Sequence, residues 1–238
     1  MMKYNKIIDL VKSGNFSVGD KTFKLTGTIT PEEIMHFKGL IGKEMKVLDI
    51  GVGKGVSTAL FSSICDKEVV GIDPYQTTEH NGSCEMLCVA LDIKKPVIVE
   101  KMSIECFNEE ALLDEKFDFI FIDGYHTFDA TLVDFLIVED KLKDGGLIAF
   151  HDCYYRSKQK VLNFALKNRD YELLDQKPKA ERGLIKRVAR CIYHALFKYK
   201  TNLPLTIKLL RPGKTDSSLV IIRKKSDYKP LYSEYFKF

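Results

Sequence analysis

The stretch that decides the fold of this 238-residue chain is Lys46-Val47-Leu48-Asp49-Ile50-Gly51-Val52-Gly53-Lys54-Gly55. An apolar run ends at an acid, three glycines follow at alternate positions, and a helix-forming segment begins near Val56. Glycines let the backbone approach a ligand closely, and the first turn of a helix offers free N–H groups to it. The stretch therefore predicts a buried strand, a loop that binds a nucleoside cofactor, and a helix.

The spacing of the glycines and the position of Asp49 separate two classes of nucleoside cofactor. A loop that binds a dinucleotide reads Gly-x-Gly-x-x-Gly, and its pyrophosphate disfavours a negative charge nearby. Here the third glycine comes one residue early and Asp49 would face the phosphates, which argues against an NAD-linked oxidoreductase. A carboxylate instead suits a cofactor with a cationic amino-acid end. Taken alone, the loop also fits a glycine-rich turn in an α/β core that binds nothing.

Short apolar runs alternate with longer amphipathic segments between residues 46 and 152, as in a parallel sheet covered by helices. Two later runs, 171–175 and 218–224, predict the antiparallel pairing that completes the sheet. We therefore expect an α/β, Rossmann-like, doubly wound sheet of seven strands, mostly parallel, with an antiparallel closing strand and helices on both faces. The expected core strands are 46–50, 68–73, 96–101, 117–123 and 147–152, and the expected helices are 56–65, 83–93, 104–113, 128–142 and 157–167.

Two helices have clear sequence signals. Thr30-Pro31-Glu32-Glu33 combines a capping residue, a proline suited to the first helical position and a glutamate that completes a capping box. A helix should run from there to about Ile41. In the segment 128–142, apolar residues recur near a spacing of 3.6 and should face the sheet, with Asp134 and Glu139 on the solvent side.

These patterns divide the chain into four parts. Residues 1–45 form an N-terminal segment with a capping helix, and residues 46–176 form the core. Residues 177–217 are a basic helical insertion, and residues 218–238 hold the closing strand and a C-terminal tail. With 45% hydrophobic residues, a chain of this length can bury one sizeable core with an appendage.

Polar side chains stand where the expected strands end, which is the edge at which open α/β sheets bind ligands. Asp49 and Asp73 end the first two strands, Ser103 follows the third, and Asp123 ends the fourth. The fifth strand ends in His151-Asp152. Asp73 lies at the right distance after the glycine loop to accept hydrogen bonds from both ribose hydroxyls of a nucleoside, although an Asp-Pro pair also fits an ordinary turn.

Two further motifs resemble those of a known family. They are Phe-Asp-Phe-Ile-Phe-Ile-Asp-Gly-Tyr-His-Thr-Phe at 117–128 and Leu-Lys-Asp-Gly-Gly-Leu-Ile-Ala-Phe-His-Asp at 142–152. With the glycine loop, they resemble the class I S-adenosylmethionine (SAM)-dependent methyltransferases, and within these the Asp-Gly-x-His subgroup of sugar and small-molecule O-methyltransferases. The resemblance covers roughly residues 26–153. It implies SAM as the cofactor, bound by Asp49, Gly51, Gly53, Ser57, Asp73, Met102 and Ser103.

The same resemblance implies how the methyl acceptor is activated. A hydroxyl is a poor nucleophile until its proton is removed, and His126, with an unperturbed pKa of about 6.5, can accept that proton. A loop histidine alone more often bonds to a neighbouring turn, but the nearby Asp123 and Asp152 favour a catalytic base. These two aspartates are also candidate ligands for Mg²⁺ or another divalent cation, unless Asp152 only orients His126. Cys153 replaces the asparagine of the catechol type and would bind such an ion poorly.

The insertion is strongly basic, although the whole chain has a formal net charge of only +4. Between 177 and 216 it carries 11 lysines and arginines against Glu181 and Asp216, and residues 184–199 place apolar and basic residues on opposite helical faces. Three ligands fit such a helix: an anionic membrane surface in loose contact, a phosphorylated or lipid-linked sugar acceptor, and nucleic acid. The alternative is a solvated helix docked on the domain or on a second subunit, which leaves a homo-oligomer open.

Composition and motifs narrow the cellular locations and the functions that this chain could have. We find no apolar run long enough to span a bilayer and no signal peptide, so we expect a cytoplasmic protein, at most peripheral at a membrane. None of the six cysteines forms a Cys-x-x-Cys pair, and we expect reduced core residues. A nucleic-acid acceptor is disfavoured, because base methylation usually needs an Asn/Asp-Pro-Pro-Tyr/Phe motif where this chain has Asp-Gly-Tyr-His. A non-catalytic binding protein with the same fold is the second alternative.

Overall fold

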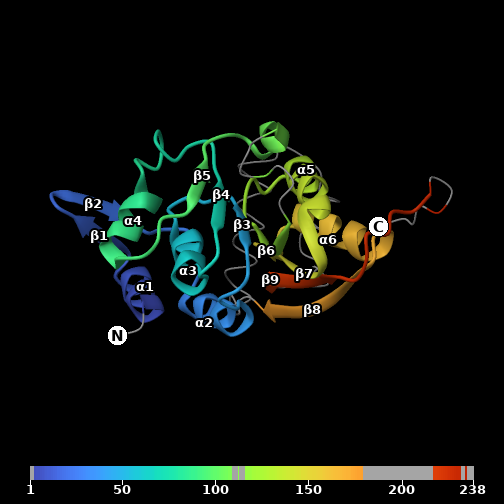
Figure 1. Cartoon of the computed structure of the whole chain (residues 1–238), viewed down its shortest axis with the longest axis horizontal. Helices are drawn as coiled ribbons and strands as arrows, with labels where there is room; N and C mark the ends of the chain where they lie inside the picture. The colour runs from blue at the N-terminus through green and yellow to red at the C-terminus, as the bar shows by residue number, and fades with distance from the viewer. Residues whose placement is uncertain (1–2, 109–111, 113–115, 179–216, 232–233, 235–238) are drawn as a thin grey trace, which may run out of the picture.

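A seven-stranded sheet forms the centre of the computed structural model, which describes residues 3–108, 112, 116–178, 217–231 and 234 (Figure 1). The strands are β3 (Val47–Ile50), β4 (Val69–Ile72), β5 (Val97–Val99), β6 (Phe117–Ile122), β7 (Leu142–His151), β8 (Tyr171–Pro178) and β9 (Ser217–Lys224). They lie in the order β5-β4-β3-β6-β7-β9-β8. β9 pairs antiparallel with both β7 and β8, and the other neighbours pair parallel. This arrangement confirms the expected fold class.

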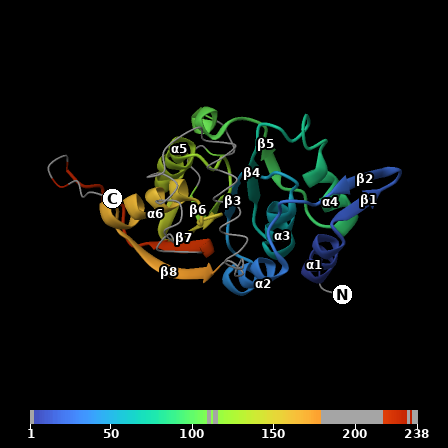
Figure 2. The ribbon, with the colours of Figure 1, turned by 180° about the vertical axis from the view of Figure 1, so that it is seen from behind.

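Helices cover both faces of this sheet, as Figure 1 shows and Figure 2 repeats from behind. They are α1 (Lys3–Ser13), α2 (Pro31–Leu40), α3 (Val56–Ile64), α4 (Ser83–Leu91), α5 (Phe128–Val138) and α6 (Arg156–Asn168). One apolar cluster joins α1 to α4 with one face of the sheet, and a second cluster joins α5 and α6 with the other face. The expected capping box of α2 is confirmed: Thr30 Oγ1 accepts the Glu33 N–H at 3.2 Å, and Glu33 Oε2 accepts the Thr30 N–H at 2.8 Å.

Four phenylalanines hold α2 against the sheet. Phe37 of α2 is fully buried, and its ring meets those of Phe61, Phe119 and Phe121 edge to face, with centroid distances of 5.5, 5.9 and 5.3 Å. Phe61 comes from α3, and the other two are alternate residues of β6 that point to the same face. Edge-to-face pairs add to the free energy gained by burying apolar area. The leading helix is therefore part of the core.

The N-terminal segment contains more structure than the sequence patterns predicted. After α1 the chain forms a hairpin of β1 (Asn15–Val18) and β2 (Lys21–Lys24), and α2 follows. Phe16 and Phe23 stack across the hairpin with their centroids 4.9 Å apart and join the same apolar cluster as α1. Each strand has four residues, which is too few for an alternating pattern to be recognised.

Two expected elements have different bounds. The segment 104–113, expected to be α-helical, begins as the 3-10 helix η1 (Ser103–Asn108), where Glu105 Oε2 accepts the Met102 N–H at 2.9 Å. The expected helix 128–142 also ends early, because η3 (Glu139–Lys141) follows α5 and β7 begins at Leu142 rather than at residue 147. Gly145, at φ +78, lies in the irregularity that lets this longer strand pair with β6.

The prediction that Asp134 and Glu139 face solvent is wrong. Both side chains are buried. Glu139 pairs with Arg169, whose Nε lies 2.7 Å from the Glu139 Oε2, and Asp134 lines a cavity at the edge of the sheet. A helical-wheel pattern cannot reveal this, because the groups that compensate a buried charge come from other parts of the chain.

The sheet extends into both ends of the expected insertion, since Lys177 and Pro178 lie in β8 and β9 begins at Ser217. The amphipathic helix expected within 184–199 lies outside the described residues, as does Cys191. The other cysteines are buried and free, as expected; they are Cys65, Cys84, Cys88, Cys106 and Cys153. In the described part of the chain, no helix is both long and apolar enough to cross a membrane.

We predict that Phe37→Ala will lower the free energy of unfolding by about 3–5 kcal/mol, because it leaves a cavity among three rings. Urea denaturation followed by circular dichroism measures this loss. Met35→Ala on the same helix is the control. The Met35 side chain is 47% exposed, so its truncation should lower the free energy of unfolding much less. Equal losses in the two variants would contradict the proposed packing of α2.

Candidate active site

A cavity of about 340 Å³ opens at the carboxyl ends of β3, β4 and β6. Most of the site residues expected from the sequence meet there. The residues that line it are Ile50, Gly51, Gly53, Ile72, Asp73, Pro74, Tyr75, Met102, Ser103, Asp123, Gly124, Tyr125, His126, Ala130 and Asp134. Asp152 lies beside it, next to His126, whereas Asp49 and Ser57 are not among the lining residues.

The glycine loop can follow its path only without side chains. Gly51 has φ +91, and a Cβ at this position would lie 2.5 Å from the Asp123 carbonyl oxygen. Gly55 has φ +85, and a Cβ there would lie 2.4 Å from the Cα of Cys84. Both conformations favour glycine, and both contacts are with backbone atoms that cannot move aside. The loop therefore packs directly against the end of β6 and the start of α4, and leaves space for a ligand above it.

Asp49 stands behind this loop rather than in the cavity. It is fully buried, and its Oδ2 accepts hydrogen bonds from Ser57 Oγ at 2.7 Å and Thr58 Oγ1 at 2.6 Å. Burial raises the pKa of the Asp49 carboxyl to about 7, against the two hydroxyl bonds that lower it. The structure thus corrects the expected direct contact of Asp49 and Ser57 with a cofactor. The two side chains tie β3 to the first turn of α3 and so fix the loop between them.

Asp73 takes the position that the sequence predicted. Its Oδ2 accepts the Gly53 N–H at 2.7 Å, its Oδ1 accepts the Tyr75 N–H at 2.8 Å, and the residue lines the cavity. Gln76 adds a second link to the loop, because its Nε2 donates to the Gly53 carbonyl oxygen at 2.7 Å. A carboxylate oxygen can accept more than one hydrogen bond, so Asp73 can still accept bonds from a diol in the cavity.

The end of the cavity near β5 contains a polar pair. Ser103 Oγ donates to Asp134 Oδ1 at 2.5 Å, and Met102 lines the wall beside them. Burial raises the pKa of Asp134 to about 6, although the bond from Ser103 and the charge of Lys158 lower it. The sequence did not identify Asp134 as a site residue. One signal was available in the sequence. Asp134 lies one helical turn after Ala130 and one turn before Val138, and both of these apolar residues were expected to face the sheet.

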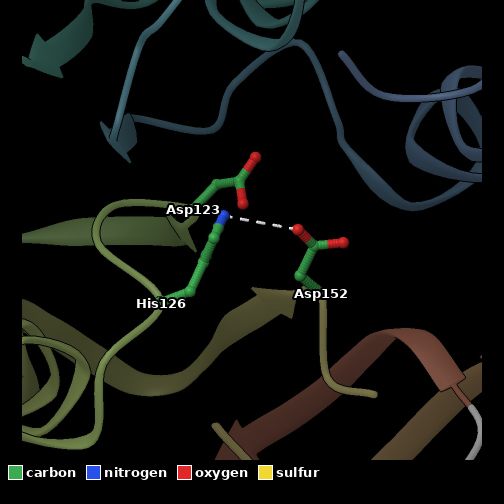
Figure 3. Close-up of side chains that lie close together, drawn as sticks. All are labelled: Asp123, His126 and Asp152. Atoms are coloured by element: carbon green, nitrogen blue, oxygen red, sulfur yellow. Dashed lines mark ion pairs between the residues drawn. The ribbon is translucent and has the colours of Figure 1, made fainter. Parts of the chain in front are cut away.

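His126 and two aspartates form a cluster beside the same cavity (Figure 3). The Nε2 of His126 lies 3.4 Å from Asp152 Oδ2, and one ligand atom of each of Asp123, His126 and Asp152 lies within 4.8 Å of the others. The His126 ring also stacks on Tyr155 with a centroid distance of 5.3 Å. Burial and the charge of Lys158 lower the pKa of His126, outweighing Asp123 and Asp152, which raise it. The imidazole is therefore largely neutral at pH 7 and can accept a proton.

His151 joins this cluster to the leading helix. Its Nδ1 lies 3.1 Å from Asp123 Oδ1, and its Nε2 lies 3.3 Å from Glu33 Oε1, which also accepts a hydrogen bond from Ser218 Oγ at 2.8 Å. Burial lowers the pKa of His151, but the two carboxylates override this and raise it to about 10. The sequence predicted Glu33 only as a capping residue, so its role in neutralising His151 was missed.

Lys158 of α6 is a third residue whose role sequence reasoning missed. It is fully buried, and its Nζ lies 3.6 Å from Asp123 Oδ1. The Asp123 carboxyl is thus flanked by two cationic side chains, and although burial raises its pKa, the charges of His151 and Lys158 bring it below the ordinary value. The cluster has the spacing to hold a divalent cation, but its charge does not fit one, because His151 and Lys158 already neutralise the aspartates. Cys153 turns inward, and its Sγ donates to the Phe150 carbonyl oxygen at 3.2 Å.

Comparisons with known proteins identify the domain that contains these residues. Residues 48–153 match a family model described as a methyltransferase domain, and this range contains the glycine loop and the acid and histidine cluster. No curated protein matches the chain in sequence.

Solved structures with the same fold include several methyltransferases. The O-methyltransferase TomG from Streptomyces achromogenes, involved in tomaymycin synthesis and solved with SAM, is 10% identical, with 95% of this chain and 91% of that chain covered and a TM-score of 0.60. An O-methyltransferase from Bacillus cereus, solved with SAH, is 13% identical, with 74% and 84% covered and a TM-score of 0.58. An rRNA methylase from Streptococcus thermophilus is 16% identical, with 82% and 95% covered and a TM-score of 0.56. At these identities the likeness shows the Rossmann-like methyltransferase fold alone.

The His151 network makes a prediction about stability and pH. Because its pKa is raised from 6.5 to about 10 on folding, His151 contributes its full stabilisation below about pH 6.5 and loses it as the pH rises toward 10. Glu33, whose pKa falls from 4.5 to about 2, contributes fully above about pH 4.5. Urea denaturation of His151→Gln should therefore show a loss of about 3–5 kcal/mol near pH 6.

The loss in His151→Gln should shrink as the pH approaches 10. His80→Gln, which lies outside this network, controls for the removal of a histidine. A loss that stays constant from pH 6 to pH 10 would mean that His151 is not held as a cation.

Proposed function

We propose that the protein is a SAM-dependent O-methyltransferase that methylates a hydroxyl group of a small molecule, with a sugar or glycoconjugate as the acceptor. The observation that carries this proposal is the placement of His126 and Asp152 next to a cavity that also contains the glycine loop and Asp73. Both halves of a methyl transfer, a nucleoside site and a proton acceptor, then share one space. The matching methyltransferase domain and the fold support the same conclusion.

The residues around the glycine loop fit a SAM molecule. The bare backbone at Gly51 and Gly53 lets a ligand lie on the loop, Asp73 would accept the ribose hydroxyls, and Met102 and Ser103 would border the adenine. When bound, SAM supplies an electrophilic methyl group on a sulfonium that needs little activation. Asp49 and Ser57 act on this site indirectly, through the shape of the loop.

Beside the proposed site for the methyl acceptor, His126 is the group that would take the proton. His126 is neutral near pH 7, and its Nε2 faces Asp152, so the imidazolium that forms on taking a proton has a carboxylate 3.4 Å away. Asp152 in this way orients the ring and stabilises its charged form. The two cations beside Asp123 keep that carboxylate ionised, and no step requires a metal ion.

Aromatic side chains around this end favour a ring-shaped acceptor. Tyr75 and Tyr125 line the cavity. Tyr155 stacks on His126, and the tilted ring of Tyr154 lies next to Tyr155 with a centroid distance of 4.5 Å. Flat aromatic faces pack well against the apolar face of a sugar or another ring. The basic insertion remains our predicted source of contacts for a phosphorylated or lipid-linked group, and we propose a cytoplasmic protein with at most peripheral membrane contact. Nucleic acid is the alternative acceptor, and salt-sensitive RNA retention would support it.

The cofactor assignment predicts that Asp73→Ala will weaken SAM binding. Loss of charged hydrogen bonds to the ribose should lower the affinity roughly 10- to 100-fold. Isothermal titration calorimetry measures it, with Asp20→Ala in the β1–β2 turn as a control that should bind normally. If wild-type protein binds no SAM at millimolar ligand, the proposed function fails.

The acceptor assignment predicts that His126→Gln will lower turnover roughly 10²- to 10⁴-fold while SAM affinity stays unchanged. Turnover is measured as SAH release with a panel of monosaccharides, nucleotide sugars and catechols. Because the pKa of His126 is lowered, activity of the wild type should fall only below about pH 6.5 as the ring becomes protonated. Full turnover in His126→Gln would exclude this residue as the base.

A further inference from the structure

The charged side chain of Lys158 lies in the protein interior, where burial of a charge costs free energy. Its side chain is fully buried, and among the described residues its Nζ has no hydrogen-bond partner. A buried ammonium without an acceptor at hydrogen-bond distance is expensive, and it is usually compensated by charge or used for function. Its nearest carboxylate oxygen is Asp123 Oδ1, at 3.6 Å.

The positive charge of Lys158 lies near the place that a divalent cation would occupy in the cluster of Asp123, His126 and Asp152. Asp123, His126 and Asp152 bring three ligand atoms together with spacing that would suit a divalent cation. Lys158 approaches the same Asp123 oxygen from α6, while His151 approaches it from β7 at 3.1 Å. A cation bound to this oxygen would face two positive groups at short range, and repulsion at such distances is strong away from water.

We infer that Lys158 takes the electrostatic place of a divalent cation, so that this site works with a built-in lysine charge instead of a bound metal ion. Lys158 is a positioning residue: it holds Asp123 ionised and in place and thereby shapes the pocket in which His126 acts. Its side chain is shielded from the cavity and does not line it. This inference rests on the proposed function and adds that the same site needs no metal ion.

Metal binding tests this inference without SAM or an acceptor, so its failure is separate from failure of the proposed function. Free Mn²⁺ is measured by electron paramagnetic resonance in solutions of wild-type protein, Lys158→Met and Lys158→Gln. We expect no binding by the wild type below millimolar Mn²⁺. Removal of the lysine charge should tighten binding at least about tenfold, and a further Asp152→Asn change should abolish the gain.

Lys160→Met is the matched control, because Lys160 lies on the same helix with its side chain exposed. It should leave Mn²⁺ binding unchanged. Circular dichroism identifies any variant that does not fold. If both Lys158 variants fail to fold, the wild type alone decides, through its affinity for Mn²⁺.

Two results would overturn the inference. One is micromolar Mn²⁺ binding by the wild type that is lost in Asp123→Asn, and the other is a folded Lys158→Met variant with no gain in Mn²⁺ affinity.

Discussion

The close approach of two backbones at the carboxyl ends of β3 and β6 is the constraint on which the site depends. Gly51 lies so near Asp123 that any side chain at this position would collide with its carbonyl group. This contact sets the glycine loop and the loop that carries His126 side by side. Both loops therefore line one cavity, in which the proposed cofactor and acceptor would meet.

A chain of alternating charges joins this contact to the rest of the molecule. Glu33 lies in the first turn of α2, His151 ends β7, Asp123 follows β6 and Lys158 lies in α6. Each charge neighbours one of opposite sign. In a poorly solvated interior such pairs hold their members ionised and fix their positions. The leading helix therefore contacts His151 through Glu33, and packs on β6 through Phe37. The electrostatics of the site and the packing of the N-terminal segment cannot be altered separately.

Sequence patterns predicted the sheet and its edge because both follow from local rules. Alternating runs gave the parallel strands, and the carboxyl ends of parallel strands necessarily place Asp73, Asp123 and His126 near one another. The prediction that Asp49 contacts a cofactor failed because side chains alternate between the two faces of a strand. Asp49 lies on the same face as Val47, which packs on α3, and so it does not reach the cavity at the end of the strand. Asp134, His151 and Lys158 depend on contacts between segments far apart in the sequence, as does Glu33 with Ser218, 185 residues away. No local pattern encodes such pairs.

The pairing of β8 with β9 has a consequence for how this protein can vary. Pro178 and Ser217 are partners in the ladder, so the chain leaves the sheet and returns to it at the same place. That place is at the edge of the sheet where the parallel strands end, since His151, the last residue of β7, is opposite Leu219. The hydrogen-bond ladder thus sets no length for residues 179–216. A change in the number of residues between Pro178 and Ser217 would therefore leave the register of β8 with β9 intact.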